Sequence, residues 1–194
     1  MAAHLAGATA FCASMSEARR QVFAGRRLVK GTGRPLIDGI NDLQIRERAG
    51  RTPPELLQEL RLTLPKAVHR RATYPRILRP VSISDPVVGS IRLGELMDVI
   101  YTRDAWMHRV DLARATEQPL ELTSDHDGRV VADVVRDWAD RHSRPFRLEL
   151  DGPAGGSYAS GVDGEGHSLD AVEFCRILSG RGTGSGLLGT RVLF

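Results

Sequence analysis

The chain has 194 residues, of which 41% are hydrophobic and 26% are charged, as in a folded globular protein with one domain or two small ones. It contains no apolar run near the roughly 18 residues of a membrane span. The net charge of +3 comes from scattered arginines rather than a basic cluster, so neither nucleic acid nor a membrane is expected as a partner. No basic segment precedes an apolar stretch at the N-terminus, and Cys12 and Cys175 stand far apart, so we expect a reduced, cytoplasmic protein.

The first part of the chain is predicted to be helical. Apolar residues at helical spacing predict one amphipathic helix over residues 2–24, ended by Gly25. Glycine and proline in residues 25–38 indicate a loop, and a short helix is predicted over residues 40–49.

A strong helix start follows at Thr52-Pro-Pro-Glu55. Thr52 can cap the first turn, proline suits the first helical position, and Glu55 can reach back to the cap. The helix should run to about Arg71, with a bend or interruption at Pro65. Prolines and a glycine in residues 72–92 then predict an extended connection.

A long helix is predicted from Ile91 or Leu93 to about Thr116, and Pro119 closes it. We place the domain boundary in residues 117–123, which gives a helical domain over 1–118 and a small α/β domain over 119–194. The fold class predicted is therefore α+β.

The C-terminal part changes in character. A helix with a valine-rich apolar side is predicted over residues 125–141, and clean alternation predicts a strand over 146–151. A glycine-rich turn leads to a second strand near 157–160. A short helix is predicted over 169–178, and a last strand over 187–194.

Two polar residues lie on an apolar face of the long helix. Asp104 and His108 are four residues apart, which places them one turn apart on the same side of a helix. Burying a carboxylate or an imidazole without a partner costs several kcal/mol, so the pair requires a mutual hydrogen bond, a salt bridge or a metal ion. The apolar neighbours at helical spacing are Leu93, Met97, Ile100, Tyr101, Leu112 and Ala115.

A zinc-type site needs three protein ligands with nitrogen or oxygen donors and an open position for chemistry. His4 is the candidate third ligand, because it also lies on an apolar stripe and two packed helices can bring such faces together. In the alternative interpretation, Asp104 pairs with Arg103 or another arginine, and His108 is an ordinary core histidine.

The neighbours of His108 leave a further choice open. Asp111 can orient the second ring nitrogen of His108, or it can pair with Arg114 three residues on, which we favour. The other histidines are expected at the surface: His69, His126, His142 and His167.

The segment Thr102–Thr116 resembles the signature of the mycothiol-dependent maleylpyruvate isomerase-like family, part of the DinB-like superfamily. Residues 3–7 resemble the family segment that carries its first metal-binding histidine. Similar stretches are Asn41-Asp42 followed by Arg-Thr-Pro-Pro-Glu-Leu-Leu, and Glu173–Gly182 followed by Gly-Leu-Leu-Gly-Thr-Arg-Val.

This resemblance implies a DinB-like helical bundle with a zinc-type site formed by His4, Asp104 and His108, followed by a sterol-carrier-like C-terminal part. It also implies that the metal activates a small-molecule thiol, mycothiol, toward an electrophilic substrate in an isomerase or transferase reaction. An arginine of the C-terminal part, Arg181 or Arg191, is implied as a catalytic residue that binds a carboxylated substrate.

Two departures from the family pattern bear on these expectations. Asp104 stands where family enzymes carry glutamate, and His4 lies near Met1 although the family has a helix before that histidine. We therefore expect a bundle without its first helix, whose exposed apolar surface would favour a homo-oligomer. The alternative function is a non-catalytic descendant that binds a small molecule or a protein.

Overall fold

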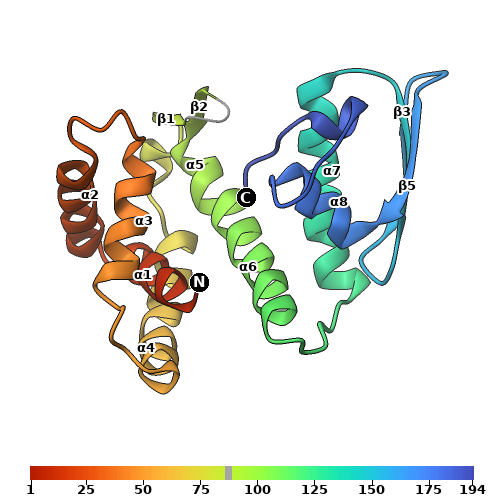
Figure 1. The fold of residues 1–194 in the computed structure, drawn as a ribbon. Coiled ribbons are helices and arrows are strands. Elements are labelled where there is room, and N and C mark those ends of the chain that lie inside the picture. Colours follow the sequence, from red (N-terminus) through yellow and green to blue (C-terminus); the bar gives the residue numbers. More distant parts are fainter. Residues whose placement is uncertain (86–88) are drawn as a thin grey trace. The chain divides into compact units, whose positions relative to one another are not determined.

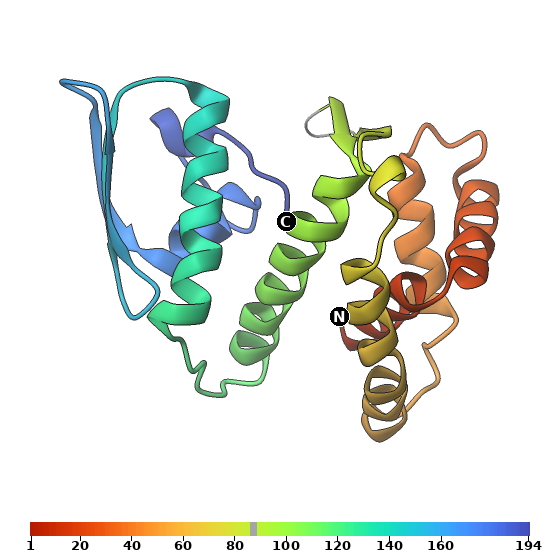
Figure 2. The same ribbon diagram turned by 180° about the vertical axis from the view of Figure 1, so that it is seen from behind.

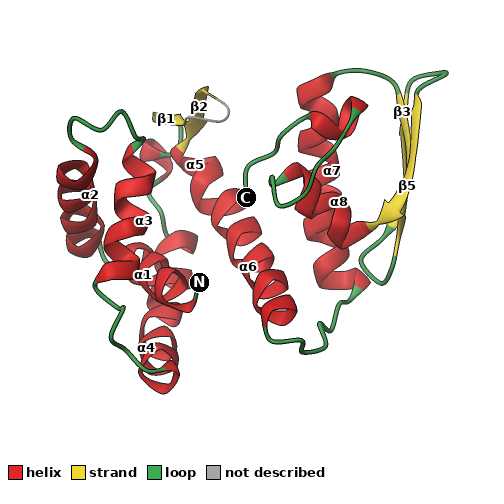
Figure 3. Ribbon diagram, viewed as in Figure 1, coloured by secondary structure: helices red, strands yellow, loops and turns green. Residues whose placement is uncertain are grey.

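The computed structural model describes residues 1–85 and 89–194, which form two compact units, Met1–Val99 and Ile100–Phe194. Helices alternate with two small sheets, so the predicted α+β class is confirmed (Figures 1 and 3). Within the described ranges, none of the helices combines the length and the apolar character that a membrane span requires. The helix around residue 108 belongs to the second compact unit, although the sequence prediction places it in a domain ending at residue 118.

The first helix predicted is in fact two helices, α1 (Ala2–Ala13) and α2 (Met15–Val29). Ser14 separates them with an extended backbone (φ −144°, ψ 131°), and its Oγ accepts a hydrogen bond from the Glu17 backbone N–H at 3.3 Å. Serine followed three residues later by glutamate is a helix-start pattern, which the apolar stripe running across it concealed. The single helix over residues 2–24 was therefore wrong.

Close backbone approach fixes how α2 meets the next helix, α3 (Leu36–Arg46). A Cβ on Gly39 would lie 2.2 Å from the Gly25 carbonyl oxygen, so only glycine fits at this crossing. Gly25 therefore lies where α2 crosses α3, and it does not end its helix. The loop is consequently shorter than the predicted 25–38, and the short helix begins before residue 40.

The start and extent of the capped helix α4 (Pro53–Ala72) agree with the sequence prediction, but the helix is not interrupted at Pro65. The backbone N–H of Thr52 donates to the Glu55 carboxylate at 2.7 Å. Helix α1 packs against both α4 and α3, as the views from both sides show (Figures 1 and 2).

The predicted extended connection contains regular structure. It includes a 3-10 turn, η1 (Arg76–Leu78), and an antiparallel pair formed by β1 (Ser82–Asp85) and β2 (Gly89–Arg92). Residues 86–88 of the predicted connection lie outside the described residues.

The long helix is confirmed in extent, but it is divided into three elements. They are α5 (Leu93–Glu95), the π-type turn η2 (Leu96–Ile100) and α6 (Tyr101–Ala115). Asp104 and His108 both lie on α6, on its first and second turns.

The second unit contains a three-stranded sheet with helices on one face (Figures 1 and 2). In the sheet order β4-β3-β5, β3 runs antiparallel to β4 and parallel to β5. Residues of β3 alternate between buried and exposed, as predicted for this strand. The elements are η3 (Ser124–Gly128), α7 (Arg129–His142), β3 (Phe146–Asp151), β4 (Gly156–Ser160), β5 (Glu165–Asp170), α8 (Ala171–Leu178) and η4 (Gly186–Gly189).

Two predictions near the C-terminus were wrong. Strand β5 was not predicted, and the helix after it begins at Ala171 because the Asp170 side chain caps it, accepting from the Val172 N–H at 2.9 Å. The predicted last strand over 187–194 is absent from the described residues. Instead, the Val192 N–H donates to the Leu178 carbonyl at the end of α8 at 3.1 Å. This segment therefore hydrogen-bonds to the end of a helix rather than to the edge of a sheet.

Trp138 forms the centre of the core of the second unit. Its ring is fully buried and packs edge-on against Phe146 and Phe174, with centroids 4.9 and 5.4 Å away. Its indole N–H donates to the Leu187 carbonyl at 2.9 Å, so the polar edge of the ring is also satisfied. The C-terminal segment is thereby tied to α7.

Two histidines predicted at the surface also pack on this tryptophan. The His142 ring lies 4.3 Å from the Trp138 ring, the His167 ring lies 6.4 Å away, and the Nε2 atoms of both histidines are buried. Burial, with the positive charge of Arg144 as a smaller cause, lowers the pKa of His142 below its ordinary value of 6.5. His69 and His126 are exposed, as predicted.

This lowered pKa predicts a stability that falls in mild acid. The unfolded chain takes up a proton at His142 before the folded chain does, so the free energy of unfolding decreases as the pH falls below 6.5. Urea unfolding at about pH 7.5 and about pH 5.5 measures this loss. His142→Gln should show a smaller loss than the parent, whereas His126→Gln, at an exposed site, should match it. Equal pH dependence in all three proteins would contradict the assignment to His142.

Candidate metal centre

Asp104 and His108 form a close pair on one side of α6. The His108 Nε2 and the Asp104 Oδ1 are 3.3 Å apart, and the side chains are 13% and 26% exposed. Ligand atoms bound at 2.0–2.1 Å to a tetrahedral ion lie about 3.3 Å from each other. The pair therefore has the spacing of two ligands of a zinc-type ion, as well as that of an ion pair.

The alternative pairing of Asp104 with Arg103 was wrong. Arg103 is 2% exposed, and its guanidinium binds two carboxylates of α7: it lies 2.7 Å from Asp133 and 2.6 Å from Asp137. It also donates to the Leu193 carbonyl at 3.2 Å. Arg103 thus fixes α6 to α7, and with it the direction in which the neighbouring Asp104 leaves the helix.

The other ring nitrogen of His108 faces a second carboxylate. Its Nδ1 lies 3.5 Å from the Asp111 Oδ2, and the same oxygen lies 2.9 Å from the Arg181 guanidinium. Arg176 lies 3.5 Å from the other Asp111 oxygen. The favoured pairing of Asp111 with Arg114 was wrong, since Arg114 binds Glu173.

These contacts separate the two candidate substrate-binding arginines. Arg181 is held by both oxygens of Asp111, with its Nε 2.9 and 3.1 Å from them. Arg191 is an exposed residue whose guanidinium donates to the Ser179 carbonyl at 2.9 Å. Arg181 therefore holds Asp111, the carboxylate beside His108, whereas the guanidinium of Arg191 is more accessible to solvent.

His4 lies on α1 in the first compact unit, whereas Asp104 and His108 lie in the second. The His4 ring is partly buried, and its Nδ1 lies 2.8 Å from the Oε1 of Gln44 on α3. The His4 Nδ1 thus has a hydrogen-bonding contact within its own unit, which is usual for histidines that bind metals through the other nitrogen. The His108 Nδ1 has a longer, electrostatic contact with Asp111 at 3.5 Å.

Sequence reasoning missed the two glutamines behind His4. Gln44 and Gln21 are 2% and 0% exposed, and the Gln44 amide N–H donates to the Gln21 Oε1 at 2.8 Å. A signal was present, because each interrupts a buried stripe at helical spacing: Ile40 precedes Gln44, and Ala18 precedes Gln21. Such polar interruptions are the same kind of signal that identified Asp104 and His108.

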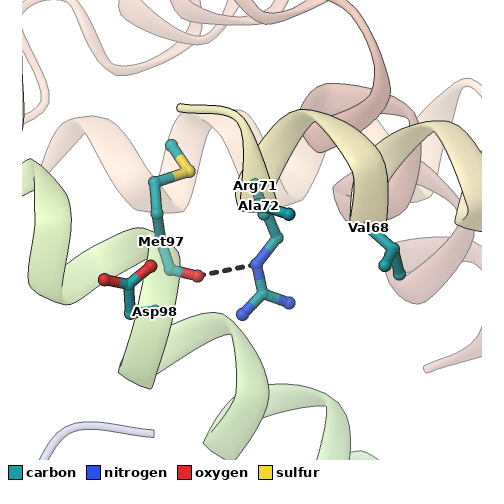
Figure 4. A pocket seen from close by; sticks show the side chains of 5 residues that line it. All are labelled: Val68, Arg71, Ala72, Met97 and Asp98. Atoms are coloured by element: carbon teal, nitrogen blue, oxygen red, sulfur yellow. Dashed lines mark hydrogen bonds between the residues drawn. The ribbon is translucent and has the colours of Figure 1, made fainter. Parts of the chain in front are cut away.

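The first unit also has a hollow of about 300 Å³ between α4 and η2 (Figure 4). Its described lining consists of Val68, Arg71, Ala72, Met97 and Asp98. The Arg71 Nε donates to the Met97 carbonyl at 2.6 Å, which joins the two helical segments, and Asp98 binds Arg79. This hollow was not predicted, and among the five residues only Asp98 offers a common metal ligand.

No family model, no curated protein and no solved structure matches this chain. Function is therefore inferred from the chemistry of these donors and from the resemblance of residues 102–116.

Proposed function

We propose that this chain is a divalent-metal-binding, thiol-dependent enzyme of the isomerase or transferase type. The proposed ligands are His4, Asp104 and His108, which offer two imidazole nitrogens and one carboxylate oxygen. The observation that carries the proposal is the 3.3 Å separation between His108 Nε2 and Asp104 Oδ1, which suits two neighbouring ligands of one tetrahedral ion. This donor set suits several divalent transition metals, and zinc is the ion that the family resemblance implies.

The surroundings of the donors support this assignment. Asp111 lies against the Nδ1 of His108 and is itself held by Arg181 and Arg176, so it can keep the Nε2 directed toward the Asp104 side. A bound zinc would lower the pKa of a thiol at its open position, which supplies a thiolate nucleophile at neutral pH. With this assistance, no side chain of the protein is needed as a general base for the thiol.

The finer features of the proposal follow the family resemblance. The fold would be a DinB-like bundle with a sterol-carrier-like C-terminal part, the thiol would be mycothiol, and its partner would be an electrophilic, carboxylated substrate. Arg191 is the better candidate to bind that carboxylate, since using Arg181 would require breaking its two-point contact with Asp111.

The rate of a thiol reaction tests this function directly. Zinc-loaded protein should accelerate the alkylation of mycothiol by a small electrophile, because the bound thiol is ionised at neutral pH. The rate is followed by loss of free thiol, with metal-free protein and zinc-loaded His108→Ala as comparisons. His69→Ala, changed at an exposed histidine, should behave as the parent.

A different result would identify the non-catalytic alternative. Zinc-loaded protein that binds its ion but leaves the mycothiol rate unchanged would contradict a thiol-dependent enzyme. Acceleration that persists in His108→Ala would contradict the proposed site instead.

A further inference from the structure

A chain of buried amides leads from the interior of the first unit to His4. Gln21 on α2 is fully buried and donates from its Nε2 to the Gly7 carbonyl at 3.1 Å and to the Glu17 carboxylate at 2.9 Å. Carbonyl and carboxylate oxygens only accept hydrogen bonds, so the NH₂ group of Gln21 must face them. The orientation of this first amide is thereby fixed.

The second amide follows from the first. With its NH₂ group turned toward Gly7 and Glu17, Gln21 presents its Oε1 to Gln44, which must then donate. Gln44 does so from its Nε2 at 2.8 Å, and its own Oε1 is left facing His4. Reversing Gln44 would set its Oε1 against the Gln21 Oε1, two acceptors with no hydrogen between them, a costly arrangement for a side chain that is 2% exposed.

The tautomer of His4 follows from the second amide. An amide oxygen 2.8 Å from the Nδ1 requires a hydrogen on that nitrogen. In the neutral ring the Nε2 then carries the lone pair, which is the form that can bind a cation.

We propose that Gln21 and Gln44 are positioning residues that hold His4 in its Nδ1-protonated tautomer and so prepare its Nε2 as a metal ligand. The second part rests on the proposed function, whereas the tautomer is a property of the first unit alone. Close packing keeps this relay, the hydrogen-bonded series Gln21, Gln44 and His4, in place. A Cβ on Gly7 would lie 2.5 Å from the Gln44 side chain. Helix α1 must therefore approach α3 at this point through a glycine.

Nitrogen NMR of the full chain, labelled with ¹⁵N-histidine, tests the tautomer without any metal. At mildly alkaline pH the metal-free parent should show the His4 Nδ1 as the protonated nitrogen and the Nε2 as the unprotonated one. The resonances are assigned by their loss in His4→Gln. A parent protein with the proton on Nε2 would overturn the inference.

Substitutions in the relay separate positioning from simple packing. Gln44→Leu should give a mixture of His4 tautomers and weaken zinc binding about 10- to 100-fold, the usual effect of removing a partner behind a metal-binding histidine. Gln44→Glu keeps an acceptor for the Nδ1 hydrogen and should keep both the tautomer and the affinity, but it should lower the free energy of unfolding, because a carboxylate oxygen then faces the Gln21 Oε1. Gln58→Leu, at an exposed glutamine of α4, is the matched control.

Two further results keep the inference separate from the proposed function. If Gln44→Leu does not fold, Gln21→Leu, which frees the Gln44 amide to reverse, should give the mixed tautomers; an unchanged pure tautomer would overturn the relay. A parent with the Nδ1-protonated tautomer that binds no zinc would support the relay and contradict the proposed function alone.

Discussion

Replacing Arg103 by methionine should lower the free energy of unfolding by about 2 kcal/mol, because two partly buried carboxylates lose their shared buried cation and each keeps only one more exposed arginine, Arg136 or Arg141. Asp133 and Asp137 lie one turn apart on α7, and their side chains are 25% and 19% exposed. The loss would remove the charged link between α6 and α7 while keeping much of the apolar stem. Chemical denaturation of the parent and the variant measures it.

The matched control for this variant is Arg136→Met. Arg136 also binds Asp133, but its side chain is 72% exposed, so its loss should cost less than about 1 kcal/mol. Adding Asp133→Asn and Asp137→Asn to Arg103→Met should recover part of the lost stability, because the two neighbouring carboxylates, which have lost their shared buried cation, are then neutral. Similar costs for Arg103→Met and Arg136→Met would contradict the role given to Arg103.

The second large effect is expected for zinc affinity at the α6 pair. His108→Ala and Asp104→Asn each remove a proposed ligand, so each should weaken zinc binding by more than about 100-fold, beyond the usual effect of losing an outer partner. Competition with a coloured chelator measures the affinity, and circular dichroism checks that the helices are retained.

Asp104→Glu provides a more specific comparison for the same pair. Glutamate keeps the carboxylate and corresponds to the residue that the resembling family carries, so this variant should bind zinc within about 10-fold of the parent. Binding that survives Asp104→Asn but fails in Asp104→Glu would indicate a packing role for this side chain rather than a ligand.

Local patterns predicted those elements whose signals lie within one or two turns. The Thr52–Glu55 helix start and the alternation of β3 are both of this kind, and both were predicted from the sequence. The break at Ser14 carried an equally local signal, but a continuous apolar stripe outweighed it in the interpretation. Strand β5 had no such signal: it is held by parallel pairing to β3, as in Phe146 opposite Glu165, which depends on the fold.

The same distinction applies to the candidate centre. The closeness of Asp104 and His108 was predictable, since helical spacing alone places them on one face. The partners of Arg103 and Asp111 were not, because they lie 30 to 70 residues away in sequence on other elements of the unit. The two nearby pairings considered from the sequence, Asp104 with Arg103 and Asp111 with Arg114, were both wrong.

Zinc analysis of His4→Ala beside the parent tests most directly whether one ion is shared by His4, Asp104 and His108. After loading with zinc and removal of the excess, the parent should retain about one zinc per chain and His4→Ala almost none. His69→Ala should retain as much as the parent. Full zinc retention in His4→Ala, or a parent that retains none, would contradict the shared site.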